Sequence, residues 1–241
     1  MKTAVISDIH GNATAFEAVL NDIASVAVDR VLSLGDNIGY GPEPEKVITL
    51  LREKNIPSVI GNHELGVIRP EFLTLFNPVA RKSIEMTLAM LSETSMRTIR
   101  NFKSAIVDGE LRFVHGFPPE SPNKYLFEVS PSEIQSTLAE LNERICFIGH
   151  THDLEILILE NDRLSRYPLG KGSFPLNPAN KYLINAGSVG QPRDRNSQAK
   201  YVIWDSDARA LSVRYVTYHI ADTVKKIYQA GMPEQHALIL I

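Results

Sequence analysis

The sequence predicts an α/β fold in which two facing sheets carry helices on their outer sides. The first half of the chain alternates short apolar runs with segments of helical spacing, which is the rhythm of a parallel sheet with covering helices. After residue 152, strand-like runs follow one another, separated by turns. No repeat, low-complexity tract or clear linker divides the 241 residues. We therefore expect a single domain spanning residues 1–241.

The first sixty residues supply the βαβαβ part of this pattern. One segment places Phe16, Val19 and Ile23 at helical spacing, and a second does so with Val47, Ile48 and Leu51. The apolar runs between these segments are short and β-rich, as buried strands are. The expected strands are 3–7, 30–34 and 57–60, and the expected helices are 14–24 and 44–54.

The rest of the chain supplies a hairpin, further helices and a run of antiparallel strands. Asn77-Pro78 opens one helix, and Ser130 is a suitable N-cap for another. The turn Asp108-Gly109-Glu110 joins two strands into a hairpin. The expected helices are 78–91, 131–141 and 222–229. The expected strands are 104–107, 111–114, 145–148, 154–159, 163–168, 182–186, 201–205 and 211–218, and those after residue 152 are expected to be antiparallel.

Composition narrows the class of protein. Hydrophobic residues make up 44% and charged residues 22%, as in ordinary globular enzymes, and the net charge of -3 argues against a dedicated nucleic-acid surface. The lone Cys146 lies in an apolar run, so we expect a buried side chain and no intramolecular disulfide. The N-terminus does not resemble a signal peptide, and no apolar run reaches the ~20 residues that span a bilayer. We expect a cytoplasmic protein without a membrane partner.

Five short motifs rich in Gly, Asp and Asn each follow an apolar run. In open α/β sheets, ligands bind beyond the carboxyl ends of the strands, so distant motifs can meet at one place. Residues i and i+2 of an extended segment point the same way, which lets Asp8 and His10 face one ion, and likewise His150 and His152. The motifs are Asp8-Ile9-His10-Gly11-Asn12, Gly35-Asp36-Asn37, Gly61-Asn62-His63-Glu64, Val114-His115-Gly116 and Gly149-His150-Thr151-His152.

The number of candidate ligands favours two metal ions. A single structural zinc is tetrahedral and closed, and the motifs offer too many ligands for it. Two ions that share a bridging carboxylate use such a set and leave room for water and substrate, as in two-metal phosphoester hydrolysis. Without thiolates, Mn, Fe, Ni, Co or Zn is favoured over soft metals. The candidate ligands are Asp8, His10, Asp36, Asn62, His115, His150 and His152.

Taken together, the motifs resemble the full motif set of the calcineurin-like metallophosphoesterases. Gly187-Ser188-Val189-Gly190-Gln191-Pro192-Arg193 is similar to a segment of their small bacterial and archaeal branch. The resemblance implies a four-layer α/β/β/α sandwich of two mixed sheets flanked by helices, with two divalent ions and attack on phosphorus by a metal-bridging hydroxide. It assigns one ion to Asp8, His10, Asp36 and His152. It assigns the other ion to Asp36, Asn62, His115 and His150.

The resemblance also implies catalytic and substrate-binding roles. His63 would protonate the leaving group or stabilise the transition state, and Asp36 would bridge the ions and help to orient His63. A guanidinium matches phosphate bidentately, so Arg193 is a candidate phosphate ligand, with a surface salt bridge as its alternative. The candidate substrate-binding residues are Asn62, His63, Arg193, Asn37 and Tyr40. Glu64 is expected to start a helix or support the ligands, and His219 and His236 are expected to be structural or exposed.

We therefore expect a metal-dependent phosphoesterase with two divalent ions, Mn first among them. The expected substrate is a small phosphate ester or nucleotide-like molecule, and a phosphoprotein substrate is left open. The sequence does not decide between diester and monoester preference, and a homo-oligomer is possible from it. Substrate choice is expected to depend on Tyr40, on loops 70–78, 117–127 and 171–178, and on Phe117 as a wall of the pocket. The alternative is a non-catalytic scaffold of the same fold, but such descendants tend to lose ligands that this chain keeps.

Overall fold

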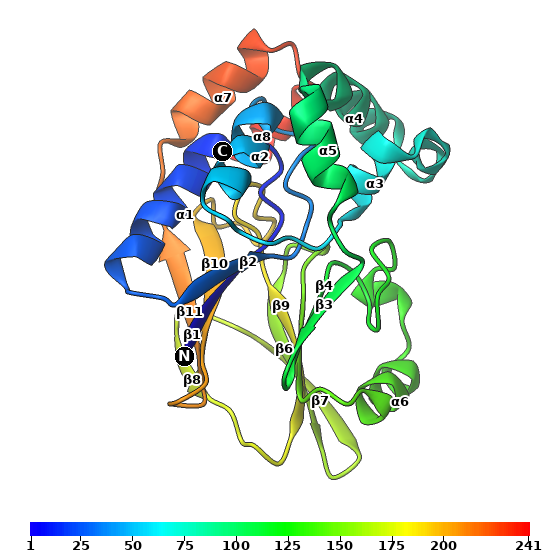
Figure 1. The fold of residues 1–241 in the computed structure, drawn as a ribbon, viewed down its shortest axis with the longest axis vertical. Coiled ribbons are helices and arrows are strands. Elements are labelled where there is room, and N and C mark those ends of the chain that lie inside the picture. The colour runs from blue at the N-terminus through cyan, green and yellow to red at the C-terminus, as the bar shows by residue number, and fades with distance from the viewer.

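The computed structural model describes residues 1–241 and contains two β-sheets packed face to face (Figure 1). The first sheet has the strand order β2-β1-β10-β11-β8, with β1 at Lys2–Ile6, β2 at Arg30–Ser33, β8 at Gly172–Pro175, β10 at Ala199–Asp205 and β11 at Ala210–Val216. The second sheet has the order β3-β4-β5-β9-β6-β7, with β3 at Ala105–Asp108, β4 at Leu111–Val114, β5 at Ile145–Ile148, β6 at Leu154–Glu160, β7 at Arg163–Pro168 and β9 at Lys181–Ala186.

Both sheets are mixed. In the first sheet β1 pairs parallel with β2 and antiparallel with β10, and in the second sheet β4, β5 and β9 run parallel. The antiparallel prediction for the later strands is confirmed for the β6–β7 and β10–β11 pairs. It is wrong for one side of β9, because β9 inserts between β5 and β6 and so lies parallel to β5 and antiparallel to β6.

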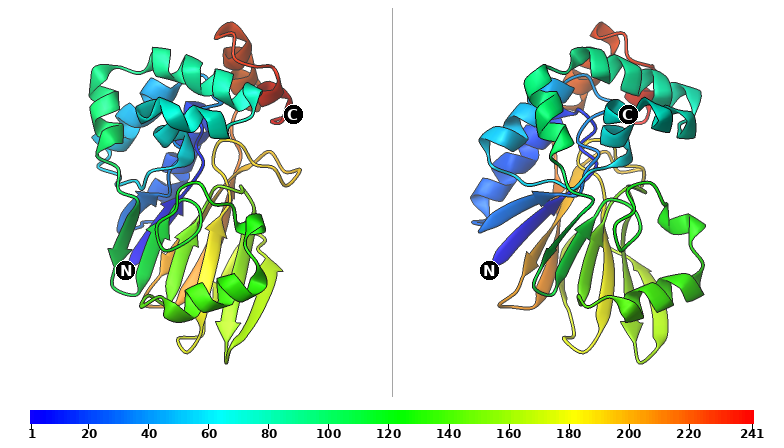
Figure 2. Two further views of the ribbon diagram at one scale, coloured as in Figure 1. Left: turned by 90° about the vertical axis from the view of Figure 1, so that its right-hand side faces the viewer. Right: turned by 45° about the vertical axis from the view of Figure 1, so that its right-hand side comes forward.

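Helices cover the outer faces of the two sheets unequally. A single helix, α6, packs on the second sheet, whereas the other helices gather on the first sheet and beyond its upper end (Figures 1 and 2). The helices are α1 (Ala13–Ser25), α2 (Pro44–Glu53), α3 (Asn62–Ile68), α4 (Pro78–Met90), α5 (Glu93–Arg100), α6 (Pro131–Glu140), α7 (Ile220–Gln229) and α8 (Gln235–Leu238), with 3-10 turns η1 (Pro70–Leu75) and η2 (Leu126–Glu128).

Three apolar clusters separate the four layers. Strand β1 shows the alternation that builds them: Ala4 and Ile6 face the cluster under the helices, while Val5 faces the cluster between the sheets. Strand β5 does the same on the other side, where Phe147 lies between the sheets and Cys146 packs toward α6. Successive strand residues point to opposite faces, so each central strand contributes to two apolar layers. The predicted four-layer sandwich and the burial of Cys146 are confirmed.

The predicted strand 57–60 is wrong. This segment makes only two isolated parallel bridges, Ser33 with Ser58 and Val59 with Lys103. The first bridge reaches the edge of the first sheet, and the second reaches the approach to β3, at the edge of the other sheet. A segment that passes from one sheet to the other cannot build a ladder with either. Helices α5 and α8 and strand β8 were not expected from the sequence.

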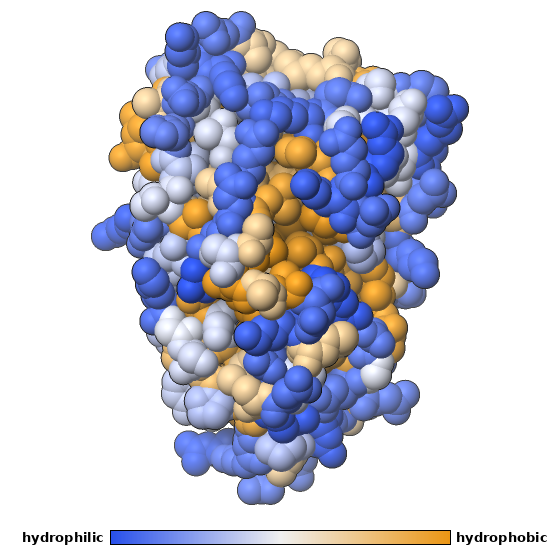
Figure 3. All heavy atoms as spheres, turned by 60° about the vertical axis from the view of Figure 1, so that its left-hand side comes forward, coloured by the Kyte–Doolittle hydropathy of each residue, from blue (hydrophilic) through white to orange (hydrophobic).

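An apolar hollow lies on the side of the molecule that carries α1 (Figure 3). Its volume is about 890 Å³, and it opens between β2 and β3, the edge strands of their sheets, with Leu20, Val28, Leu50 and Ile106 among its lining residues. None of the predicted site residues lines it. No helix of the structure has the length and apolar character that a membrane span requires.

Candidate metal centre

Four strands deliver the predicted ligands to one end of the sandwich. Asp8 follows β1, Asp36 follows β2, His115 follows β4, and His150 follows β5. The first two strands belong to one sheet and the last two to the other, so the candidate ligands lie where both sheets end. Asn62 is the first residue of α3.

Asp8, His10 and His152 form the first group of close ligand atoms. The two imidazole Nε2 atoms lie 3.0 Å apart. Asp8 Oδ1 lies 3.2 Å from His152 Nε2 and 3.7 Å from His10 Nε2. This oxygen is buried and has no hydrogen-bond partner. An unpaired carboxylate oxygen that faces two ring nitrogens fits a cation that all three coordinate.

Asp36, His115 and His150 form the second group. His115 Nε2 lies 3.1 Å from His150 Nδ1 and 3.2 Å from both Asp36 Oδ2 and Asn62 Oδ1. Asp36 Oδ2 is also 3.9 Å from His10 Nε2, in the first group. One carboxylate oxygen therefore lies between the two groups, as a bridging ligand requires.

Backbone carbonyls fix which nitrogen of each imidazole faces the cluster. His10 Nδ1 contacts the carbonyl of Ile38 at 3.2 Å, and His115 Nδ1 contacts that of Leu34 at 2.8 Å. A carbonyl only accepts, so these Nδ1 atoms donate, and the opposite Nε2 is the nitrogen whose lone pair a cation would use once any proton on it is displaced. His150 is turned the other way: its Nε2 contacts the Asn123 carbonyl, which leaves Nδ1 for the cluster.

The electrostatics of the cluster suit displacement of protons by cations. Burial disfavours the charged form of Asp36, yet its neighbours His115 and His63 hold its pKa well below the usual range. Burial alone would lower the pKa of His115, but the Asp36 carboxylate raises it to about 9. The two groups thus retain a proton between them at neutral pH, which a cation would replace on binding.

Five candidate ligands have left-handed backbones, which is unusual for residues other than glycine. The φ angles are 53° for Asp8, 49° for His10, 49° for Asp36, 70° for His150 and 66° for His152. Hydrogen bonds to the loop that carries Asp36 hold this strained geometry. The Asp8 amide donates to the carbonyl of Gly35 at 3.1 Å, and the His10 amide donates to the carbonyl of Asp36 at 2.9 Å. Most of the candidate ligands therefore carry backbone strain, as residues at functional sites often do.

Glu64 holds the loop that carries Asp36 through hydrogen bonds to its backbone. Its carboxylate accepts hydrogen bonds from the backbone amides of Asp36, Asn37 and Gly61. Burial raises its pKa to about 7. Gly61 is needed here, because a Cβ would lie 2.1 Å from Asp36 Oδ1. Glu64 was expected to start a helix or to support the ligands; its hydrogen bonds agree with the second alternative, and the helix begins two residues earlier, at Asn62.

Asn37, one of the predicted substrate ligands, is not brought to the cleft. Its side chain is fully buried and accepts from Ser33 Oγ at 2.6 Å. Its amide nitrogen donates to Ser58 Oγ at 3.0 Å and to Glu64 at 3.2 Å. The amide is therefore occupied inside the fold.

His63 lies beside the bridging carboxylate. Its backbone amide donates to Asp36 Oδ1 at 2.9 Å, and its Nε2 lies 3.8 Å from Asp36 Oδ2. Its Nδ1 packs against Gly39, where a Cβ would approach to 2.0 Å. Burial lowers its pKa to about 4. A neutral imidazole is thus held next to the cluster.

Aromatic side chains form the walls around the cluster. The Tyr40 ring lies 4.5 Å from the His10 ring and 4.4 Å from the His63 ring. Tyr125 stacks on His150 at 3.6 Å, and Phe76 meets His63 edge-on at 5.3 Å. The loops 70–78 and 117–127 therefore do reach the site, as expected from the sequence.

Two other expectations about the surroundings are wrong. Residues 171–178 contain β8, which pairs with β11 at the edge of the first sheet and lies toward the opposite end of the molecule in Figure 1. Phe117 is buried in the apolar cluster under α6 and forms no wall of the cleft. Arg193 is exposed and donates to Gln191 Oε1 at 3.2 Å; it forms no ion pair, so the surface salt bridge offered as its alternative is absent.

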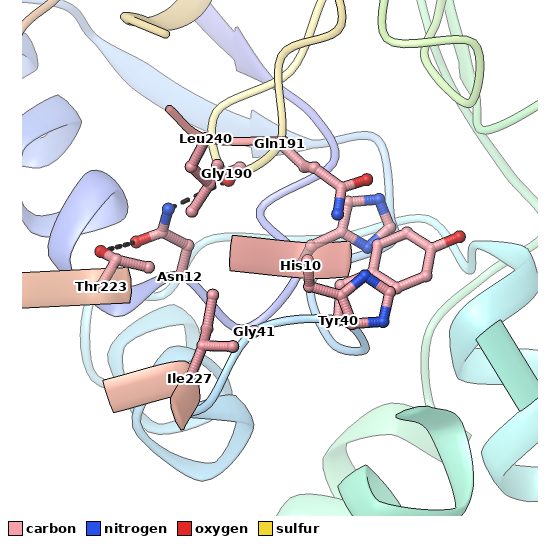
Figure 4. A pocket seen from close by; sticks show the side chains of 10 residues that line it. His10, Asn12, Tyr40, Gly41, Gly190, Gln191, Thr223, Ile227 and Leu240 are labelled. Atoms are coloured by element: carbon pink, nitrogen blue, oxygen red, sulfur yellow. Dashed lines mark hydrogen bonds between the residues drawn. The ribbon is translucent and has the colours of Figure 1, made fainter. Parts of the chain in front are cut away.

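His236 is a residue near the site that sequence reasoning missed. Its side chain is buried, and its ring lies 4.5 Å from that of Tyr40. With His10, Tyr40 and Gln191 it lines a small cavity, seen from close by in Figure 4. It comes from α8, more than eighty residues after the last motif, and no Gly, Asp or Asn neighbour marks it. His219 is exposed, as expected.

Comparisons with known proteins agree with this geometry. A family model described as the calcineurin-like phosphoesterase superfamily domain matches residues 1–209, which include all five motifs. An uncharacterised protein of Methanocaldococcus jannaschii is 33% identical over 237 residues, which make up 96% of this chain and 93% of that protein. α7 and α8 lie outside the part that the family model matches.

Two solved structures have the same fold over nearly the whole chain. A metallophosphoesterase from Sphaerobacter thermophilus is 34% identical with a TM-score of 0.85, covering 100% of this chain and 98% of its own. A hypothetical protein from Pyrococcus horikoshii has a TM-score of 0.82 at 17% identity, covering 99% of this chain and 97% of its own. The second likeness supports the fold alone.

Proposed function

Because this chain belongs to the calcineurin-like phosphoesterase superfamily and is a metal-dependent phosphoesterase, we propose that it hydrolyses small phosphate esters at a centre of two divalent ions. The proposal of two ions, rather than one, is supported by the position of Asp36 Oδ2, which lies 3.9 Å from His10 Nε2 and 3.2 Å from His115 Nε2. When bound, two such ions activate water as the nucleophile and neutralise charge on the transferred phosphoryl oxygens.

The ligands divide into two sets that share Asp36. We assign Asp8, His10, Asp36 and His152 to one ion. We assign Asp36, Asn62, His115 and His150 to the other. This division is supported by the group of Asp8, His10 and His152 and by the group of Asp36, His115 and His150. The carbonyl contacts that turn the ring nitrogens inward support it as well.

His63 acts on the substrate in this proposal. Its Nε2 lies 3.8 Å from Asp36 Oδ2. His63 also forms a third group of close ligand atoms with His10 and Asp36, but both proposed sets already have four ligands without it. Because burial lowers its pKa to about 4, the ring is neutral at pH 7. It therefore donates a hydrogen bond to the leaving oxygen as charge develops there, and transfers a proton only as the bond breaks.

We also assign Tyr40, Asn62 and Arg193 to substrate binding. Tyr40 faces two imidazoles of the site with φ of 59°, a strained conformation for a bulky residue. Burial raises the pKa of its hydroxyl to about 12, so the hydroxyl stays a hydrogen-bond donor at neutral pH. Arg193 supplies a guanidinium for phosphate oxygens. Asn37 supports the loop from inside and binds no substrate.

We propose manganese as the first metal to test, since the site offers only imidazole, carboxylate and amide ligands. Metal-free protein is prepared with a chelator and supplied in turn with Mn²⁺, Fe²⁺, Co²⁺, Ni²⁺, Zn²⁺ or Mg²⁺. The substrates are an aryl phosphate, a bis-aryl phosphate, nucleotides and a phosphopeptide. We expect Mn²⁺ to restore hydrolysis of at least one small ester, and the panel to distinguish monoester from diester preference.

Asp36→Asn should abolish the restored activity, whereas Asp222→Asn, a change at an exposed carboxylate on α7, should keep it. A protein that hydrolysed none of these esters with any metal would contradict the proposed function.

A further inference from the structure

A basic pocket is lined by the segment that follows Gln191, whose carbonyl contacts the candidate ligand His152. The loop 192–197 and residues 239 and 241 line a cavity of about 330 Å³. Arg193 and Arg195 are its only charged side chains. Asp194, which separates them in the sequence, is engaged by Lys200 Nζ at 2.8 Å, so neither guanidinium is neutralised by that carboxylate. A pocket with two unpaired guanidinium groups favours an anion.

His236 lines a separate small cavity with Gln191 and Leu240, which are chain neighbours of Pro192, Ile239 and Ile241 of the basic pocket. Its side chain is 6% exposed, and its Nε2 is buried without a hydrogen-bond partner. It lines a cavity of about 10 Å³ together with Tyr40 and Gln191, and no acidic side chain lines that cavity (Figure 4). A buried polar nitrogen without a partner is costly, so a native structure usually supplies one from water or from a ligand.

The basic pocket and the metal centre share one segment. The carbonyl of Gln191 contacts His152 Nδ1, and the Gln191 side chain accepts from Arg193. Burial, and then the charges of His63 and Arg193, lower the pKa of His236 to about 4, so its neutral ring can donate one hydrogen bond.

The C-terminal helices are anchored where they can serve the site. Thr223 Oγ1, on α7, donates to Asn12 Oδ1 at 3.0 Å, and Asn12 Nδ2 donates to the carbonyl of Gly190 at 3.0 Å (Figure 4). These bonds connect α7 to the loop after β1 and to the segment that leads into Arg193.

We propose that Arg193, Arg195 and His236 form a second anion subsite, which binds a phosphoryl group of the substrate other than the one that is cleaved. The substrate class is then a phosphate ester with at least two phosphoryl groups, as in a nucleoside diphosphate. The inference rests on the proposed function, since the subsite is defined by its place beside the metal centre. His236 lies outside the part of the chain that the family model matches, so the subsite depends on this chain's own C-terminal segment.

A kinetic comparison of two substrates tests the subsite. With the Mn²⁺-loaded protein, kcat/KM is measured for a nucleoside 5′-diphosphate and for an aryl phosphate. We expect Arg195→Gln to lower the ratio of the first to the second by about tenfold or more, the loss that follows removal of one charge-assisted hydrogen bond. His236→Phe keeps a ring against Tyr40 but removes the nitrogen, and it should lower the same ratio through KM.

Matched controls separate this effect from general changes in charge or stability. Arg97→Gln removes an exposed arginine of α5, and His219→Phe changes an exposed histidine before α7; both should leave the ratio unchanged. A ratio unaffected by Arg195→Gln and His236→Phe would overturn the subsite.

Equilibrium binding distinguishes failure of the subsite from failure of the proposed function. Metal-loaded protein is titrated by calorimetry with methylphosphonate and with methylenediphosphonate, and the heat of the ligand with free metal is subtracted. Arg195→Gln should weaken the binding of methylenediphosphonate and leave the binding of methylphosphonate unchanged. If that preference appears in a protein that hydrolyses no ester, the subsite stands and the proposed function fails; if hydrolysis occurs and the variant weakens neither or both ligands equally, the subsite fails.

Discussion

At the scale of single residues, the site depends on which atom of each side chain is already engaged. Asp8 uses Oδ2 for Ser7 and the His150 amide, which leaves Oδ1 free to face His10 and His152. Asp36 uses Oδ1 for the amide of His63 and leaves Oδ2 between the two ligand groups. Each carboxylate is thus held by one oxygen and presents the other, which limits the motion of the free oxygen and prepares it for a cation.

His63→Ala should lower kcat by roughly 10²-fold or more, as expected when a residue that assists the leaving group is lost. Metal content should remain that of the wild type, because His63 belongs to neither proposed ligand set. Turnover of an aryl phosphate and metal analysis check both expectations. His219→Ala, at an exposed histidine, is the control. Full turnover in His63→Ala would remove this residue from the mechanism.

At the scale of elements, two interlocked loops build the site. The loop after β1 donates its Asp8, His10 and Gly11 amides to carbonyls of the loop after β2. Gly39 lies in the second loop with φ of 84°, and His63 from α3 packs directly on it. His63 can therefore occupy its position only because Gly39, in the loop after β2, has no side chain.

Gly39→Ala should displace His63, because the new Cβ would lie 2.0 Å from His63 Nδ1. Turnover should fall toward that of His63→Ala, with metal content retained. Gly109→Ala is the matched control, since Gly109 also has a left-handed backbone but nothing lies within 4 Å of its Cβ position. Both changes should cost about 1–2 kcal/mol of unfolding free energy from backbone strain, measured by urea denaturation. Equal turnover in the two variants would contradict this role of Gly39.

At the scale of the whole molecule, the metal centre joins the two sheets. Asp8 and Asp36 come from the first sheet, and His115, His150 and His152 come from the second. The apolar cluster between the sheets lies behind this end of the sandwich. A cation bound by ligands from both sheets binds only when the sheets are packed together, so metal binding is linked to folding of the whole molecule.

Metal should therefore stabilise the protein as well as activate it. At a concentration of Mn²⁺ about 100 times its Kd, linkage adds ~2.7 kcal/mol, which corresponds to a rise in Tm of roughly 5–10 °C for a chain of this size. Chelator should reverse the rise, and Asp36→Asn should remove most of it. Calorimetric melting with and without metal makes the measurement. An identical Tm in both conditions would show that no cation holds the sheets together.

The order of the strands and the motifs could be read from the sequence because both depend on local patterns. Alternating and continuous apolar runs marked the strands, and Asp8, Asp36, His115 and His150 lie within three residues of the strand ends. The division of the chain into one domain over residues 1–241 stays a prediction. The segment 57–60 shows the limit of local reading: it has the composition of a strand but bridges both sheets.

By itself, the sequence determined the α/β class, the strand tips and the set of residue types able to hold metal, since strand periodicity and motif spacing are properties of neighbouring residues. Only the tertiary structure decided how these residues are used. In the folded structure the Asn37 amide is hydrogen-bonded to buried side chains, Asp36 Oδ2 lies between two ligand groups, and the His236 ring packs against Tyr40. Such contacts join residues far apart in the chain, and no local pattern encodes which atom of a side chain remains free when its other atoms are engaged.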